Sequence, residues 1–555
     1  MQSQNTMTMQ HVQCTIPRCT ANGAKRNCAL CRALLFLCLA PCALIVASAA
    51  DRLEYGTYNT TSHYYTYTFE YPSVDARGDS LTLSALMCFP RLEQPSANGG
   101  ADGGECFNNI VIACHATITS NKECPSAFPD GEGGIGDVRL MMSYAAAPTG
   151  LLARPLDDPA CRNIVVMPDY EGYGITKQRP HPYLNAELTA RQTVDAVRHG
   201  LELFQSGAFT APDDYTWATA TSATHGLRNN WGTLAIGVSQ GGAVAMAVQR
   251  YVEEYALDEQ LRFRGAVCAD GPYDPLATLR FYNTGQSYHE KDIVTLPVAT
   301  AMIIKGMIDT DPLMAEHRLE DYFSPDFIRT GIFQWIDCKS DPNREMTVSD
   351  ITHALYNLCR HGSDSLTAEQ CRKMFPDYGY SLLHGYHAYA DLNRILTPEA
   401  YDYFSDSASL ASPPLHNGVM EDLHAALVRN NITDAWQPAH PLALFHSTHD
   451  TVVPIDNFLS ADSAFSDHCT LYTDTTSTSD HIVACREFFI TLGTAPDVKF
   501  IRLLCGYNNP DPVQDIHADS IATGDNCYYD LTGRRLPEKP HTGIYVHQGR
   551  VTIAR

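Results

Sequence analysis

Residues 237–242 read Gly-Val-Ser-Gln-Gly-Gly, which places a serine flanked by glycines between a strand-like segment and a helix-like segment. Residues 233–236 form a short apolar run suited to a buried strand, and residues 243–248 continue as a helix. Ser239 is therefore expected on a sharp turn from strand to helix, where glycines remove Cβ atoms that would clash. A serine held there is a candidate nucleophile, and the backbone N–H of Gln240 is a candidate donor to an oxyanion.

A serine hydroxyl becomes an effective nucleophile when a histidine takes its proton and a carboxylate orients that histidine. In the chain order serine, acid, histidine, Asp450 follows the apolar run at residues 442–445, and His481 comes 31 residues later, before a helical pattern. We predict Asp450 as the acid and His481 as the base. Other residues of these types in the same region are Asp456, Asp474, Asp480, His446, His449 and His468.

A second oxyanion donor is expected from the loop after residues 109–114, where the sequence reads His115-Ala116-Thr117. The backbone N–H of Ala116 or Thr117 would complement that of Gln240. His115 is expected to support this loop rather than to transfer protons. Removing one oxyanion donor lowers the catalytic rate about 100- to 1,000-fold, so we include this loop in the predicted active site.

Strand-like and helix-like segments alternate over the first half of the chain. Two β-rich runs joined by a turn predict an antiparallel pair, whereas the later runs are apolar throughout, as in parallel strands covered on both faces. The alternation predicts an α/β fold with a mostly parallel sheet and helices on both faces. The segments are residues 63–71 and 80–87 for the pair, 109–114, 163–167, 233–236 and 263–269 for later strands, and 187–205 for the clearest helix.

The alternation stops between about residues 274 and 437, where the pattern is mostly helical, and it resumes at residues 442–445 and 469–472. An insertion of this size is expected to cover the carboxyl ends of the strands, where ligands bind in such folds. We predict a cap that walls an acyl pocket with apolar side chains, with Ile303, Ile304 and Met307 as candidates. The predicted organisation is a leader at 1–50, a core at 51–273 and 438–500, the cap at 274–437 and an extension at 501–555.

The first 50 residues have the composition of a secretory signal peptide. They carry four basic residues and no acidic one, an apolar run at 33–46, and Ala47-Ser48-Ala49 as a cleavage site. The run is short for a membrane span, and no later segment has the required apolar length, so we expect an exported protein with no integral membrane span. Without the leader the net charge changes from −24 to −28, which disfavours nucleic acid and anionic membranes as partners.

Thirteen of the 19 cysteines lie after residue 50, and export would allow some of them to pair. The local candidates are Cys106 with Cys124, and Cys338 with Cys359 or Cys371. The cysteines at positions 114 and 268 lie inside apolar strand-like runs, so they are expected to be buried thiols.

Together these motifs resemble the α/β-hydrolase superfamily and, within it, the secretory lipases and esterases. The resemblance rests on residues 115–117, 169–174, 181–183 and 237–242 with Asp450 and His481, and it spans roughly residues 52–490. It implies hydrolysis of lipid or small-molecule carboxylic esters through an acyl-enzyme, with no metal or organic cofactor. The family's loop usually reads His-Gly-Thr, from which Ala116 departs. Histidine pairs at 384/387 and 446/449 lack a third ligand, so no metal site is predicted.

Two other functions share parts of this pattern. A prolyl-oligopeptidase-type peptidase has the same serine turn and triad order but carries a large N-terminal propeller, whereas only about 60 residues precede the first core strands here. A non-catalytic relative that binds a ligand or partner would not need an intact triad.

The last thirty residues are β-rich and basic, unlike the rest of the chain. They resemble the tail of the C-terminal sorting domains of type IX secretion in Bacteroidetes. This resemblance implies bacterial secretion machinery as a partner and a secreted, cell-surface or periplasmic location. A closing hairpin that packs on the core is the alternative.

Overall fold

The computed structural model describes residues 54–56, 64–90, 92, 105–130, 162–209, 226–284, 293–382, 385–405, 418–466 and 471–494, with the backbone of four short strands after residue 527. The predicted leader at 1–50 and most of the extension at 501–555 lie outside these residues. None of the helices in the described ranges combines the length and hydropathy needed to cross a bilayer. The four late strands pair in the order β14-β13-β15-β16, and they are β13 Tyr528–Tyr529, β14 Arg535–Leu536, β15 Gly543–His547 and β16 Arg550–Ala554.

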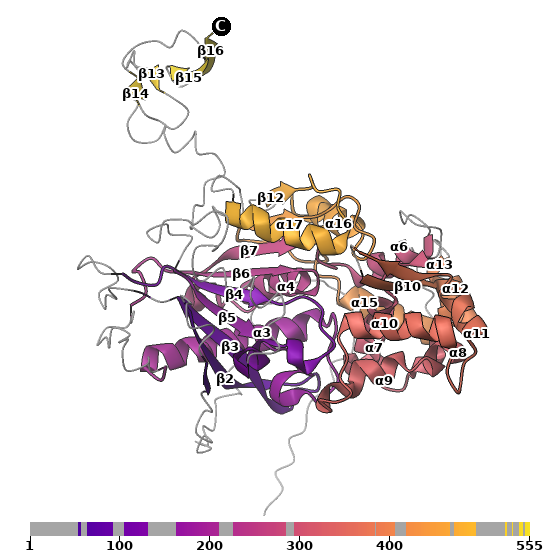
Figure 1. Cartoon of the computed structure of the whole chain (residues 1–555). Coiled ribbons are helices and arrows are strands. Elements are labelled where there is room, and N and C mark those ends of the chain that lie inside the picture. The colour runs from indigo at the N-terminus through magenta and orange to yellow at the C-terminus, as the bar shows by residue number, and fades with distance from the viewer. Residues whose placement is uncertain are drawn as a thin grey trace, which may run out of the picture. The chain divides into compact units, whose positions relative to one another are not determined.

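A nine-stranded sheet with the order β1-β2-β3-β5-β4-β6-β7-β11-β12 forms the core of the fold (Figure 1). The first four strands in this order pair antiparallel, and the pairs from β5 to β12 are parallel. The predicted antiparallel pair is confirmed, with Phe69 opposite Ala85. The strands are β1 Glu54–Gly56, β2 Tyr64–Val74, β3 Ser80–Pro90, β4 Ile110–Cys114, β5 Ile164–Pro168, β6 Thr233–Val238, β7 Phe263–Ala269, β11 Leu442–Phe445 and β12 Leu471–Asp474.

Helices cover both faces of this sheet, as the fully apolar strands predict. Successive side chains of a strand point to opposite faces, so Ile112 of β4 packs in one apolar cluster and Val111 in another. Helices with residues in the first cluster are α3 Ala186–Ser206, α4 Gln240–Glu254 and α16 Asp456–Phe465, and α17 His481–Thr494 contributes to the second.

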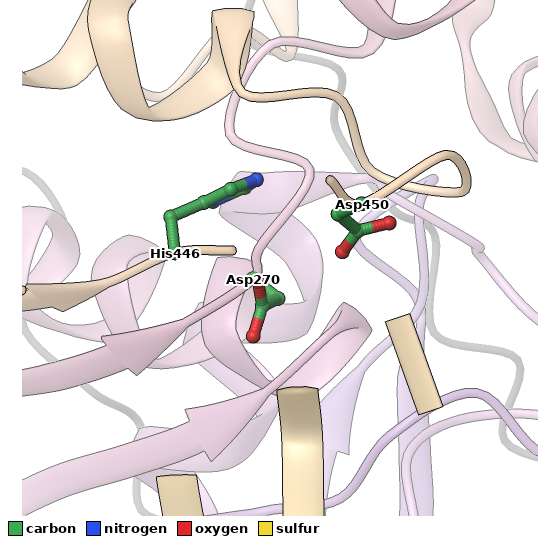
Figure 2. A group of neighbouring side chains, drawn as sticks. All are labelled: Asp270, His446 and Asp450. Carbon is green, nitrogen blue, oxygen red and sulfur yellow. The ribbon is translucent and has the colours of Figure 1, made fainter. Parts of the chain in front are cut away.

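Parallel strands bring the ends that carry the site to one edge of the sheet. The last residues of β6, β7 and β11 pair with one another, and the last residue of β4 pairs with Gly237 of β6, so the residues that follow these strands are neighbours. Ser239 follows β6, and Figure 2 shows Asp270 and His446 just beyond the ends of β7 and β11. The nucleophile predicted from the sequence therefore stands at the carboxyl edge of the sheet.

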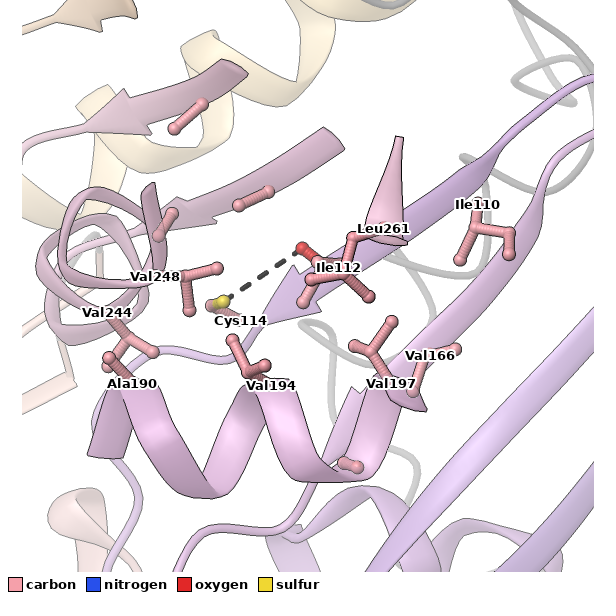
Figure 3. Packing of buried hydrophobic residues seen from close by; sticks show 14 of the residues in the cluster. Ile110, Ile112, Cys114, Val166, Ala190, Val194, Val197, Val244, Val248 and Leu261 are labelled. Carbon is pink, nitrogen blue, oxygen red and sulfur yellow. Dashed lines mark hydrogen bonds between the residues drawn. The ribbon is translucent and has the colours of Figure 1, made fainter. Parts of the chain in front are cut away.

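The packing beneath this edge is dense and aliphatic. Figure 3 shows Val194 of α3 and Val248 of α4 beside Cys114, the last residue of β4. The thiol of Cys114 is buried and points back toward the carbonyl oxygen of Ile112 at 3.9 Å. Such packing fixes α4, whose first residue follows Ser239, against the strands.

The segment between β7 and β11 forms a cap with its own apolar core, to which Phe323, Phe327 and Phe375 contribute. Besides helices it contains a small antiparallel sheet, in the order β8-β10-β9, that the sequence pattern did not predict. Its strands are β8 Ile293–Val294, β9 Asp377–Ser381 and β10 Gly385–Asp391. Its helices are α6 Pro275–Thr284, α7 Pro297–Thr310, α8 Pro325–Arg329, α9 Ile332–Asp337, α10 Val348–His361, α11 Ala368–Met374, α12 Leu392–Ile395, α13 Pro398–Ser405 and α15 Val419–Arg429.

The predicted disulfides were wrong for the described residues, because the cysteines concerned are thiols. Cys106 precedes β4, whereas Cys124 lies beyond its other end, and five residues of strand span about 16 Å at 3.3 Å each. A disulfide holds its two Cα atoms within about 7 Å. Cys359 and Cys371 are buried in the cap core as free thiols, and Cys338 is also free. The thiols at 114 and 268 are buried, as predicted.

Candidate active site

Ser239 occupies a strained turn between β6 and α4. Its φ of 54° and ψ of −127° lie outside the regions that most residues with a side chain adopt. A Cβ on Gly237 would clash with the carbonyl oxygen of Gly241, and a Cβ on Gly241 would clash with that of Cys114. Glycine is thus required on both sides, and the turn holds the Ser239 hydroxyl at the edge of the sheet.

The three residues predicted as a triad lie in one hydrogen-bonded line. The Ser239 hydroxyl is 2.9 Å from Nε2 of His481, and Nδ1 of His481 is 2.5 Å from Oδ2 of Asp450. Asp450 accepts two further hydrogen bonds at its other oxygen, from the backbone N–H groups of Val452 and Val453, both at 2.8 Å. This arrangement fixes the proton of His481 on Nδ1 and leaves Nε2 free to accept the serine proton.

The surroundings of His481 make it a stronger base. Burial by itself lowers the pKa of the imidazole, but the charge and hydrogen bond of Asp450 outweigh burial, and the charge of Asp480 adds to their effect. The pKa of His481 is therefore raised above its ordinary value of 6.5. A base of this kind takes a proton readily near neutral pH.

Two loops carry the acid and the base, and they are tied to each other. Backbone N–H of Thr448 donates to the carbonyl oxygen of Ser477 at 3.0 Å, and the hydroxyl of Ser447 donates to that of Ser479 at 2.5 Å. Glu487 in α17 accepts from the hydroxyls of Ser477 and Ser479 at 2.6 and 2.7 Å. These contacts hold Asp450 and His481 at a fixed separation.

The other acidic candidates have different partners. Asp474 accepts from the backbone N–H and hydroxyl of Thr476, Asp480 accepts from the N–H of Val483, and Asp456 begins α16. His468 lies outside the described residues. Among the described candidates, Asp450 is the carboxylate hydrogen-bonded to His481.

The loop predicted to complete the oxyanion site lies beside the serine. Ala116 and Thr117 line the same pocket as Ser239 and His481, and the Thr117 hydroxyl is 2.8 Å from that of Tyr183. His115 is buried, with ring nitrogens 2.7 and 3.1 Å from the carbonyl oxygens of Ala116 and Asp169. Burial lowers the pKa of His115. A buried ring packed against two backbone carbonyls of neighbouring loops fits the supporting role predicted for it.

Sequence reasoning missed a residue that holds Gln240. The side-chain Nε2 of Gln240 donates to Nε2 of His181 at 2.7 Å, and Nδ1 of His181 donates to the carbonyl oxygen of Glu171 at 2.8 Å. Burial, reinforced by the charge of Lys339, lowers the pKa of His181 to about 3, so the ring stays neutral and keeps this tautomer. Gln240 is thereby anchored at the residue that follows the nucleophile.

A mainly apolar pocket of about 380 Å³ opens beside Ser239, with lining from both core and cap. Of the three cap residues predicted to wall it, Ile303 does so together with Leu296 and Ala299, which lie on the same face of α7. Ile304 and Met307 are not among the lining residues of this pocket and belong to the buried core of the cap. Ile304 points to another side of the helix, and Met307 lies a turn beyond the pocket, against Asn430.

Asp270, His446 and Asp450 are the described residues that come nearest to a metal-binding set. Each offers one ligand atom, and these atoms lie within 4.8 Å of one another (Figure 2). However, one oxygen of Asp450 accepts two backbone N–H groups, the other accepts from His481, and His446 donates to a backbone carbonyl at 3.0 Å. A cation here would compete with His481 for Asp450, so the geometry suits a triad acid better than a metal ligand.

The strand order, the serine turn after β6 and the cap between β7 and β11 define the α/β-hydrolase fold. No protein-family model matches the chain, and no curated protein matches its sequence. The solved structure of the rice cell wall degrading esterase LipA from Xanthomonas oryzae is similar, with a TM-score of 0.52 and 17% identity over 78% of this chain and 90% of that chain. A ligand-bound form of that esterase gives 0.51 and 17% over 77% and 89%. At this identity the likeness shows the fold, and it confirms the predicted fold class.

Proposed function

We propose that the protein is an exported serine hydrolase that cleaves carboxylic esters. The observation that carries this proposal is the continuous hydrogen-bonded line from Ser239 through His481 to Asp450 at the mouth of a mainly apolar pocket. The proposed catalytic residues are those three, with Gln240, Ala116 and Thr117 as the source of oxyanion donors.

In the first half of the reaction, the Ser239 oxygen attacks the ester carbonyl while its proton passes to Nε2 of His481. Asp450 stabilises the imidazolium that forms, since it already accepts from Nδ1 at 2.5 Å. The carbonyl oxygen becomes an oxyanion that accepts from the backbone N–H of Gln240 and from the loop that carries Ala116 and Thr117. His481 then returns the proton to the departing alcohol, which leaves an acyl group on Ser239.

In the second half, water takes the place of the alcohol. His481 removes a proton from the water, the resulting oxygen nucleophile attacks the acyl carbonyl, and the collapse of the intermediate returns the proton to Ser239. The products are a carboxylic acid and the free serine. No redox change or additional co-reactant is required.

The pocket indicates what the acyl group is like. Leu184, Val238, Ile303, Val453 and Phe489 are among its lining residues, and the hydrophobic effect favours burying a hydrocarbon chain against such side chains. We infer small-molecule or lipid esters with an apolar acyl part as substrates.

The proposed activity is tested with a series of p-nitrophenyl esters beside aminoacyl nitroanilides. We expect turnover of the esters, none of it by Ser239→Ala, and little cleavage of the anilides. Faster cleavage of the anilides would favour the peptidase alternative, and no turnover of either series would favour a ligand-binding role.

Export is proposed from the sequence of the leader. We infer removal of the leader, residues 1–50, at the cleavage site around Ala47-Ser48-Ala49, and delivery to the periplasm, the cell surface or the medium. Mass spectrometry of the N-terminus of protein from a secreting host tests this. An intact leader on a cytoplasmic product would contradict it.

A further inference from the structure

A second buried carboxyl group lies beside the triad acid. Asp270 follows β7 and Asp450 follows β11, strands that pair along the sheet, and both side chains are almost fully buried, with exposures of 0% and 1%. Figure 2 shows the two carboxyls near each other, and their ligating oxygens lie within 4.8 Å. The mechanism above uses the charge of Asp450 directly and gives Asp270 no step of its own.

Asp270 is incompletely hydrogen-bonded. Its Oδ1 accepts from the backbone N–H of Ser447 at 2.8 Å, while Oδ2 is buried and has no hydrogen-bond partner in the described structure. Its φ of 44° is in the left-handed region, which aspartate tolerates better than most residues but still at some cost. Ionisation of a buried carboxyl that accepts few hydrogen bonds is unfavourable, so the charged form of Asp270 is disfavoured at this position.

One of the two carboxyls is expected to be ionised and the other protonated, because two like charges a few Å apart in a buried site disfavour each other. Asp450 accepts three N–H groups and Asp270 accepts one, so Asp450 holds the negative charge and Asp270 holds the proton. Burial and then the charge of Asp450 raise the pKa of Asp270 to about 8, against an opposing effect of His481. The other titratable groups that face Asp270 are Glu487, His446 and Tyr273.

We propose that Asp270 is a reserve carboxyl of the site, placed so that it can supply the negative charge that stabilises the His481 imidazolium when the side chain at position 450 carries none. Asp270 acts as a positioning residue, because it also holds Ser447 at the start of the loop that carries Asp450. This inference rests on the proposed ester hydrolysis.

The test is a double-mutant cycle on Asp270→Asn and Asp450→Asn, measured as kcat/KM for one p-nitrophenyl ester. Asparagine keeps an oxygen for the N–H of Ser447, so the variants remove charge rather than shape. With Asp450 neutralised, Asp270 loses its like-charge neighbour and ionises at neutral pH. We therefore expect Asp270→Asn to cost at least tenfold more in the Asp450→Asn background than in the wild-type background.

The residual activity of Asp450→Asn should also rise with pH as Asp270 ionises, and this rise should be absent from the double variant. Equal costs of Asp270→Asn in both backgrounds, with no change of pH profile, would overturn the inference while leaving ester hydrolysis intact. A wild-type chain without Ser239-dependent activity would overturn the proposed function and this inference together.

A second measurement does not depend on the Asp450 variant. Because the pKa of Asp270 is raised from 3.8 to about 8 on folding, its contribution to stability is fully present below the lower value and is lost as pH rises through the higher one. The Tm of the wild type should therefore fall relative to that of Asp270→Asn between pH 4 and pH 8. A constant difference in Tm over this range would show that Asp270 does not hold a proton in the folded protein.

Discussion

Two adjacent isoleucines of α7, Ile303 and Ile304, differ in whether they line the pocket beside Ser239. Both belong to the apolar core of the cap, and Ile303 also lines the acyl pocket, whereas its neighbour Ile304 does not. Replacing Ile303 by Ala makes room for about two methylene groups, each worth about 0.8 kcal/mol when buried, so the ratio of kcat/KM for octanoyl over butanoyl esters should rise about tenfold. Replacing Ile304 by Ala leaves a cavity in the cap core and should cost about 2–5 kcal/mol of stability instead.

The assay is a chain-length profile of p-nitrophenyl esters from two to twelve carbons for both variants and the wild type, beside urea unfolding of each. The ratio should change in Ile303→Ala and stay near the wild-type value in Ile304→Ala, whose unfolding midpoint should fall. Parallel loss of activity on all chain lengths in both variants would refute the assignment of Ile303 to the acyl pocket.

Three further outcomes follow from the site. His181→Ala frees the Gln240 side chain and should lower kcat about 10- to 100-fold with a smaller effect on KM, because oxyanion donors matter most in the transition state; an equal rise in KM alone would contradict this. Only neutral His481 accepts the serine proton, so kcat/KM should fall as pH drops through its raised pKa, above 6.5. Removing both carboxyl charges, with Asp270→Asn and Asp450→Asn together, should move that limb to lower pH; an unmoved limb would refute the pairing. Dialysis against EDTA should leave the rate unchanged, and a loss restored by Zn²⁺ or Ca²⁺ would indicate that the cluster in Figure 2 binds metal.

Local patterns predicted the parts of the site that depend on backbone geometry. The glycines around Ser239 are needed for one turn, and a carboxylate and a histidine after apolar strands must come to the same sheet edge. Asp450 was selected because it follows an apolar strand. Asp270 directly follows the apolar strand β7, so the same criterion could have identified this second carboxyl. The chain order serine, acid, histidine calls for a single acid, so Asp270 is left without a role in a triad of that order.

Other parts depend on contacts between distant segments. His181 and Gln240 form a hydrogen bond although they are 59 residues apart in the sequence, and a local pattern cannot predict such a contact. Apolar residues of α7 are buried on several sides, between the pocket and the cap core, so hydropathy cannot separate Ile303 from Ile304 or Met307. The small cap sheet was missed because its two longer strands contain tyrosine among small and polar residues and no continuous apolar run.

The proposed ester hydrolysis requires Ser239 to form a covalent acyl-enzyme. It is tested most directly by treating the protein with an alkyl fluorophosphonate, which traps activated serines, and mapping the modified residue by peptide mass spectrometry. We expect stoichiometric labelling of Ser239 in parallel with loss of esterase activity, and we expect His481→Ala to slow the labelling strongly. Inactivation with the label on another residue, or full esterase activity with Ser239 labelled, would contradict it.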